Sequence, residues 1–284
     1  MRNRTLKGSA AVLAFTLSHL TLQAADRLEK AFPASSSPRV SITNYAGLVR
    51  LHGWSNAQVK LLATKYSKQV RIELDTASNR VRLVTELQDR VAKPDSIRVD
   101  YELWVPRDSS LELSSNSGNL EVEGIRGQMD FDVMNAGILI RNTSGAIAVK
   151  SLGGRVEIEQ SEGVIHLTTV SGEIHLKDVN SQSLTAATST GNLFYAGDFV
   201  PAGKYQLSSQ EGSISIRCPP QASVEWNAKS VRGGIESNLP IESKRHYVRR
   251  TPSLIMHTLI GTLNSGAATV NLFTLSGKIR IYRK

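Results

Sequence analysis

The segment from Leu111 to Arg217 is a series of short units that share one pattern. Each unit has a small or polar residue, then a glycine, then apolar residues at alternate positions. Four of them are Ser-Gly-Asn-Leu-Glu-Val at 117–122, Ser-Gly-Ala-Ile-Ala-Val at 144–149, Ser-Gly-Glu-Ile-His-Leu at 171–176 and Glu-Gly-Ser-Ile-Ser-Ile at 211–216. Alternation with a period of two predicts strands with one buried face. Because the unit recurs at a nearly fixed spacing, we expect a repeat architecture.

The glycine of each unit, or the residue in its place, provides a reference position for aligning the units. These positions are Gly118, Gly127, Ala136, Gly145, Gly154, Gly163, Gly172, Gln182, Gly191, Gly203 and Gly212. Nine residues separate the early references, and the spacing lengthens toward the end. The second and fourth residues after each reference are apolar or tyrosine, so these side chains are predicted to form the core.

Two arrangements account for this spacing. An antiparallel meander has hairpins at such intervals, but the Asn-Gly and Asp-Gly dipeptides of tight hairpins are absent between these strands. A solenoid explains why the turns resemble one another, because equivalent positions stack from coil to coil. We therefore expect an all-β fold: a parallel β-helix, or β-solenoid, with coils of about 18 residues and a strand on each of two faces.

The register of the repeat depends on residues 135–137, where the glycine comes one place late. If Ala136 is the reference, Ile138 and Ile140 point inward; if Gly137 is the reference, Arg141 does. A slip of one residue exchanges the buried and exposed faces, so burial favours Ala136. We then expect two facing interior ladders: Leu120, Ile138, Val156, Ile174, Leu193 and Ile214 in one, and Met129, Ile147, Ile165 and Leu184 in the other.

The rest of the chain divides into four regions. Residues 1–24 are typical of a secretory signal peptide, with a basic start, an apolar stretch and Ala24 at a small-residue cleavage site. Residues 25–38 are polar and are expected to be a linker. Residues 39–110 are expected to form an antiparallel β cap that covers the first coil. Residues 111–284 are then the solenoid, with a basic loop at 238–256 where the repeat breaks.

With these features the sequence resembles the bacterial putative-adhesin family of unknown function, whose Ser-Gly-x-Ile-x-Val repeats form a β-solenoid. The matching stretches are Asn-Tyr-Ala-Gly-Leu-Val at 44–49 followed by Gly53-Trp54, the strand ending Trp104-Val105-Pro106, the serial repeats, and residues 261–266 and 274–281. The resemblance extends from about Val40 onward. It implies a β-solenoid fold and a location in the cell envelope. The family has no established catalytic residues that could be assigned to this sequence.

The repeat places several acidic and histidine side chains on the outer faces, but none in a convincing site. Glu121 and Glu157 would lie two coils apart, roughly 10 Å, with Leu139 between them, and we interpret them as surface carboxylates. His166 and His175 are half a coil apart, so they face opposite sides and cannot share a metal. Cys218 has no partner for an internal disulfide and is expected to be a small buried or half-buried residue. We predict no catalytic residues, no metal and no cofactor.

The basic run in 244–250 is the best remaining candidate site. It contains Lys244, Arg245, Arg249 and Arg250, which could contact an anionic partner such as phospholipid head groups or an acidic polymer. A solvated loop is the simpler interpretation. If the run binds anions, changing these four residues to serine should weaken binding to acidic lipid, and the effect should shrink as salt rises.

Three functions are compatible with these features. The first is an exported, non-enzymatic protein of the cell envelope: an adhesin or scaffold that presents a solenoid surface to an envelope polymer, a membrane surface or a protein partner. The second is a polysaccharide-active β-helix enzyme, which would need acids or bases clustered on adjacent coils. The third is an envelope-stress sensor or regulator. Nucleic acid is a poor fit for an exported chain. The periplasm, the cell surface and the exterior are the expected locations.

Overall fold

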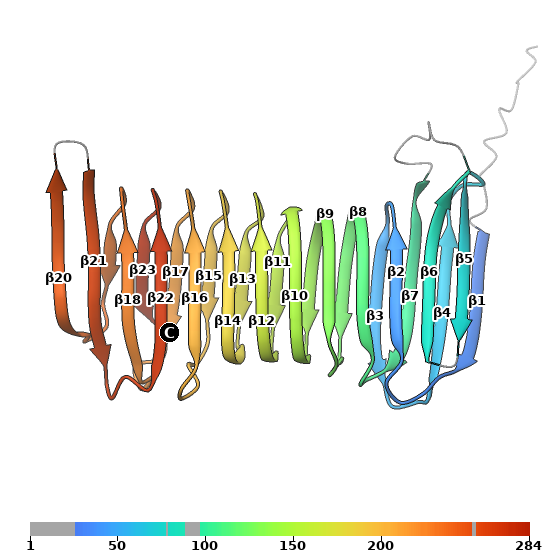
Figure 1. Ribbon diagram of the computed structural model, residues 1–284, viewed down its shortest axis with the longest axis horizontal. Helices are drawn as coiled ribbons and strands as arrows, with labels where there is room; N and C mark the ends of the chain where they lie inside the picture. Colours follow the sequence, from blue (N-terminus) through green and yellow to red (C-terminus); the bar gives the residue numbers. More distant parts are fainter. Residues whose placement is uncertain (1–25, 78, 89–96, 252–253) are drawn as a thin grey trace, which may run out of the picture.

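The repeats fold into one long ladder of strands that lie across its axis (Figure 1). The computed structural model of the chain describes residues 26–77, 79–88, 97–251 and 254–284, of which 244–251 and 254–255 are described by backbone alone. Two sheets face each other across the core. Strands β8 (Ser110–Glu123) and β9 (Met129–Arg141) are long, and each contributes its first half to one sheet and its second half to the other. The expected all-β solenoid is confirmed.

We name the two sheets by their strands in spatial order from the N-terminal end. Sheet I contains β1 (Asp26–Pro33), β4 (Gln58–Lys65), β7 (Val99–Pro106), β3 (Leu48–Trp54), the second halves of β8 and β9, β11 (Val156–Glu159), β13 (Ile174–Lys177), β15 (Leu193–Ala196), β17 (Ile214–Cys218), β23 (Ile279–Arg283) and β19 (Ile235–Ser237). Sheet II contains β5 (Val70–Ala77), β6 (Arg80–Leu87), β2 (Arg39–Asn44), the first halves of β8 and β9, β10 (Ser144–Gly153), β12 (Glu162–Thr169), β14 (Asn180–Thr188), β16 (Lys204–Ser209), β22 (Ala268–Thr274), β18 (Val224–Ser230), β21 (Leu254–Leu263) and β20 (Glu242–Thr251).

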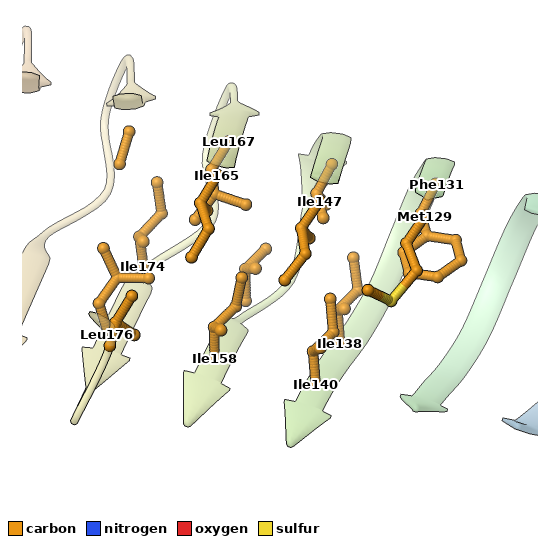
Figure 2. Packing of buried hydrophobic residues seen from close by; sticks show 14 of the residues in the cluster. Met129, Phe131, Ile138, Ile140, Ile147, Ile158, Ile165, Leu167, Ile174 and Leu176 are labelled. Atoms are coloured by element: carbon orange, nitrogen blue, oxygen red, sulfur yellow. The ribbon is translucent and has the colours of Figure 1, made fainter. Parts of the chain in front are cut away.

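The register of the coils is the predicted one. Ala136 lies opposite Gly118, and Leu120 pairs with Ile138 in the next coil. Figure 2 shows the two interior ladders facing each other. Met129, Phe131, Ile147, Ile165 and Leu167 come from sheet II, and Ile138, Ile140, Ile158, Ile174 and Leu176 come from sheet I. All ten are at most 2% exposed, so the stacked apolar side chains form one continuous core.

A ladder of buried hydroxyl groups holds one corner of the later coils. Each turn there has a serine or threonine three residues before a glycine. The Gly212 N–H donates to Ser209 Oγ (2.8 Å), and the Ser209 hydroxyl donates to the carbonyl of Gly191 in the preceding coil (2.9 Å). The same pair of contacts recurs at Thr188, Thr274 and Ser230. These hydroxyl groups satisfy turn amides and carbonyls that water cannot reach.

Removing one hydroxyl of this ladder should destabilise the protein. Ser209→Ala leaves the Gly212 amide and the Gly191 carbonyl without these partners, so we expect a loss of about 1–3 kcal/mol in the free energy of unfolding. Ser208→Ala, at the half-exposed neighbouring position, is the control and should have little effect. Urea denaturation of the two variants checks the prediction, and equal stabilities would contradict it.

The C-terminal end does not follow chain order. β22 pairs with β16 on one side and β18 on the other, while β23 lies between β17 and β19. The last two strands are therefore inserted between two coils that precede them in the sequence, as the red strands between orange ones show in Figure 1. Residues 238–256 are not a loop between the last coils: they include β20 and the start of β21, two antiparallel strands that extend sheet II beyond β18.

The N-terminal end has a similar inversion. β2 and β3 pair in parallel with β8, so the solenoid begins at Arg39 and not at Leu111. β6 and β7 form one further parallel layer outside β2 and β3. Antiparallel pairing is present at this end, but within residues 39–110 it is limited to the pairings of β4 and β5, so the expected bounds of the cap are wrong. The expected linker 25–38 is wrong in part, because Asp26–Pro33 forms β1, whose Leu28 and Phe32 pack against the core.

Candidate functional site

The outward side chains of sheet I form two regular rows, because alternate residues of each strand face solvent. One row contains Glu102, Arg50, Glu121, Leu139, Glu157, His175, Phe194, Ser215, Arg280 and Glu236. The other contains Trp104, His52, Glu123, Arg141, Glu159, Lys177, Ala196, Arg217 and Tyr282. Neighbours in a row are one strand spacing apart, about 4.8 Å. Acidic and basic residues are interleaved in the N-terminal half of both rows, whereas Phe194, Ser215 and Ala196 carry no charge.

The N-terminal part of these rows encloses a hollow of about 210 Å³. Its side chains come from four neighbouring strands, β7, β3, β8 and β9, and they are Glu102, Arg50, His52, Glu121, Glu123, Leu139 and Arg141. We call it the sheet I hollow. Arg50 Nε contacts Glu121 Oε2 at 2.9 Å, and His52 Nε2 contacts Glu102 Oε1 at 3.3 Å. These contacts fix four of the polar groups, so the hollow is already organised without a ligand.

Two charged groups of the sheet I hollow are available for a ligand. Glu123 is exposed and Arg141 is half-buried, and neither has an ion pair within the part of the chain that the structure describes. His52 is also held by stacking against Trp104, with ring centroids 5.4 Å apart. The hollow thus offers an unpaired carboxylate and an unpaired guanidinium beside Leu139. Such a lining suits a polar ligand with several hydrogen-bonding groups.

The two carboxylates considered from the sequence do not act together. Glu121 pairs with Arg50, whereas Glu157 accepts a hydrogen bond from Lys177, which also contacts Glu159 at 2.8 Å. Leu139 lies between the two glutamates, as expected. The hydrogen bond from the Lys177 ammonium holds the pKa of Glu157 below its usual value. A general acid for glycoside cleavage needs a raised pKa, whereas the pKa of Glu157 is lowered.

The two histidines lie on different sheets, as the half-coil spacing predicts. His166 is on β12 in sheet II, and His175 is on β13 in sheet I, next to Glu173 (3.4 Å) and Phe194. In the described ranges, no group of three His, Cys, Asp or Glu side chains is placed to hold a metal ion. The structure therefore supplies no geometry for a metal site there.

Cys218 is buried at the end of β17, and it is a free thiol in the described residues. Burial raises the pKa of this thiol to about 12. The thiolate is the reactive form of cysteine, and burial disfavours it here. The expectation of a small buried residue is confirmed.

The basic run is the outermost strand of sheet II. Residues 244–250 belong to β20, whose backbone pairs with β21. The side chains of Lys244, Arg245, Arg249 and Arg250 lie outside the described residues. Anion binding by this run therefore stays a prediction. Basic residues on the last strand of a sheet also oppose pairing with other chains, which is the simpler role.

The sheet I hollow was missed in the sequence. Arg50 and Glu121 are far apart in the chain and meet only because β3 pairs with β8. The available signal was Tyr45–Leu51, which has the form of one repeat unit. Treating that unit as a coil of the solenoid would have placed Arg50 and His52 on the same face as Glu121.

Comparison with known proteins agrees with the fold. A family model described as Toastrack DUF4097 matches residues 96–282, most of the chain. The chain belongs to the Toastrack DUF4097 family. This confirms the family resemblance seen in the repeats. No curated protein matches this Toastrack chain.

The solved structures that match the chain include two proteins named for adhesion. A putative cell adhesion protein from Clostridium sporogenes has 9% identity and a TM-score of 0.32, and the match covers 92% of the Toastrack chain and 100% of the other. A putative adhesin from Bacteroides fragilis has 9% identity and a TM-score of 0.41, with coverage of 90% and 97%. These values are too low to transfer a function.

Proposed function

We propose that this protein is an exported, non-enzymatic component of the cell envelope, an adhesin or scaffold that binds an extended polar polymer along sheet I. The observation that carries the proposal is the pair of outward rows on sheet I. They repeat at the strand spacing and present alternating charges, and at one point they enclose the sheet I hollow. A rigid repeated surface suits a ligand that is itself repetitive and extended.

A binding role accounts for the charges better than catalysis does. The carboxylates of Glu121 and Glu157 are each neutralised by a neighbouring cation, and the pKa of Glu157 is lowered. Paired groups of this kind are costly to use as acids or bases, but they form a fixed pattern of donors and acceptors for recognition. Glu123 and Arg141 remain free to contact the polymer.

Export is supported by residues 1–24, which have the composition of a secretory signal peptide but lie outside the described residues. The described ranges contain no helix with the length and apolar character needed to cross a bilayer.

The test is polymer binding by matched arginine variants. Purified protein is screened against glycans and envelope extract, and Arg141→Ala is compared with Arg71→Ala in whatever binds. Arg71 is an exposed arginine of β5 in sheet II, and no residue of β5 lines the sheet I hollow. Loss of a hydrogen bond to a charged group is worth about 1.5–3 kcal/mol, so Arg141→Ala should weaken binding at least tenfold. Arg71→Ala should bind like the wild type.

Two results would contradict the proposal. One is no binding to any glycan or envelope fraction by the wild-type protein. The other is equal binding by the two arginine variants, which would place the contact surface away from the sheet I hollow.

A further inference from the structure

A second hollow lies at the corner that follows the sheet I hollow along the same strands. Trp54 ends β3, Pro106 ends β7, and Arg126 follows β8. The Arg107 N–H donates to the Trp54 carbonyl (3.1 Å), and the Arg126 N–H donates to the Arg107 carbonyl (2.7 Å). Residues that are distant in sequence therefore lie beside one another at the same corner of successive coils. They enclose about 230 Å³, together with Ser36, Ser55, Asn56, Ala57 and Asp108.

Trp54 supplies an apolar wall to this corner hollow. Its indole Nε1–H donates to the backbone carbonyl of Gln58 at 2.8 Å. The polar atom of the ring is thus satisfied by the protein, and the half-buried side chain presents carbon surface to the hollow. Such a surface suits the C–H face of a sugar ring, because both surfaces are apolar and flat.

The cations of the corner hollow are only partly neutralised. Arg126 Nε contacts Asp108 Oδ1 at 3.2 Å, which compensates one guanidinium. Arg107 is exposed, and no carboxylate in the described ranges pairs with it. The side chains of Ser36, Ser55 and Asn56 add hydroxyl and amide groups to the rim. The corner therefore combines an apolar wall, neutral hydrogen-bonding groups and one uncompensated positive charge.

We propose that the corner hollow binds a sugar unit that carries an anionic group. The sugar ring packs against Trp54, and its carboxylate or phosphate pairs with Arg107, whose planar guanidinium matches either anion with two hydrogen bonds. The volume is below the range of roughly 300–1,000 Å³ typical of sites for drug-sized ligands, which agrees with a single unit of a polymer. The proposal rests on the proposed function, and it specifies an acidic saccharide as the polymer.

The experiment compares three probes that differ in charge. Trigalacturonate carries carboxylates, glucose 6-phosphate carries a phosphate, and maltotriose is neutral. Calorimetric titration of the purified protein should show at least tenfold tighter binding of one anionic probe than of maltotriose, and the probe that binds identifies the anion. Added salt should weaken this binding, because the ion pair with Arg107 is exposed to screening.

Matched variants locate the binding. Arg107→Ala and Trp54→Ala should each reduce affinity for the anionic probe at least tenfold, while Arg71→Ala, at an exposed position of β5 in sheet II, should not change it. Arg107 is exposed, so its variant reports binding even if Trp54→Ala is poorly folded. Equal affinity for anionic and neutral probes would overturn the inference, and so would equal behaviour of Arg107→Ala and Arg71→Ala.

The outcomes separate this inference from the proposed function. If Arg141→Ala abolishes polymer binding but Arg107→Ala does not, the proposed function stands and the corner inference is wrong. If neither the polymers nor the anionic probes bind the wild-type protein, both are wrong.

Discussion

Replacing Ile174 with aspartate should disrupt the middle of the solenoid. Ile174 is fully buried on β13, and its neighbours in the interior ladder are Val156 and Leu193. Aspartate removes apolar contacts in two directions and places a carboxylate where no cation can reach it. Burying an unpaired charge is among the most destabilising changes known, and we expect a loss of about 4 kcal/mol or more. The midpoint of thermal unfolding should fall by about 10 °C or more.

The control places the same charge on the outer face. Ser215 is half-buried, and its side chain points away from the core, opposite Arg280 on the next strand. Ser215→Asp should leave the unfolding midpoint within a few degrees of the wild type, because the new carboxylate stays solvated beside a guanidinium. Unchanged thermal stability of Ile174→Asp would show that the interior ladder is wrong at this position.

Adding a single methyl group at Gly212 should destabilise the fold nearly as much as Ile174→Asp. A Cβ atom there would lie 1.8 Å from the carbonyl oxygen of Gly191 in the preceding coil. The obstacle is backbone, so it cannot be relieved by a side-chain rotation. The Gly212 carbonyl also accepts a hydrogen bond from Thr274 in the following coil. Any shift therefore strains both neighbouring coils, and we expect Gly212→Ala to cost about 3 kcal/mol.

Gly234 provides the matched control for this glycine. A Cβ atom at Gly234 would meet nothing within 4 Å. Gly234→Ala should therefore change the free energy of unfolding by less than about 0.5 kcal/mol. Denaturant unfolding of the two variants measures the difference. Similar stabilities would mean that the coils at Gly212 are less closely stacked than the structure shows.

The repeat pattern determined the fold of the central coils. In each unit, the alternation of apolar residues determines which side chains are buried. In a parallel stack, equivalent residues of successive coils face the same side, so the same pattern applies to every coil. The register at Ala136 could be decided because the alternative would have buried Arg141. Both ladders from Leu120 to Ile214 followed from this local information. The close glycine contacts at the turns explain why the units resemble one another.

The order of the outer coils was decided by the tertiary structure. The alternation in β22 shows which of its residues are buried, but it does not show that β16 and β18 are its neighbours. Such pairing depends on contacts between distant segments, and several strand orders satisfy the same local pattern. Chain order was assumed at both ends. At the C-terminal end the later strands β22 and β23 lie between earlier strands, and at the N-terminal end the later strands β6 and β7 lie outside β2 and β3.

The candidate sites depend on the same long-range pairings. Arg50 reaches Glu121 because β3 pairs with β8. Trp54 lies beside Arg107 because the Arg107 N–H donates to the Trp54 carbonyl. Period-two alternation tells which side chains face water, and that much the sequence determined by itself. Which of those side chains become neighbours is set by the lateral order of strands. That order is fixed by hydrogen bonds between segments that the local pattern does not connect.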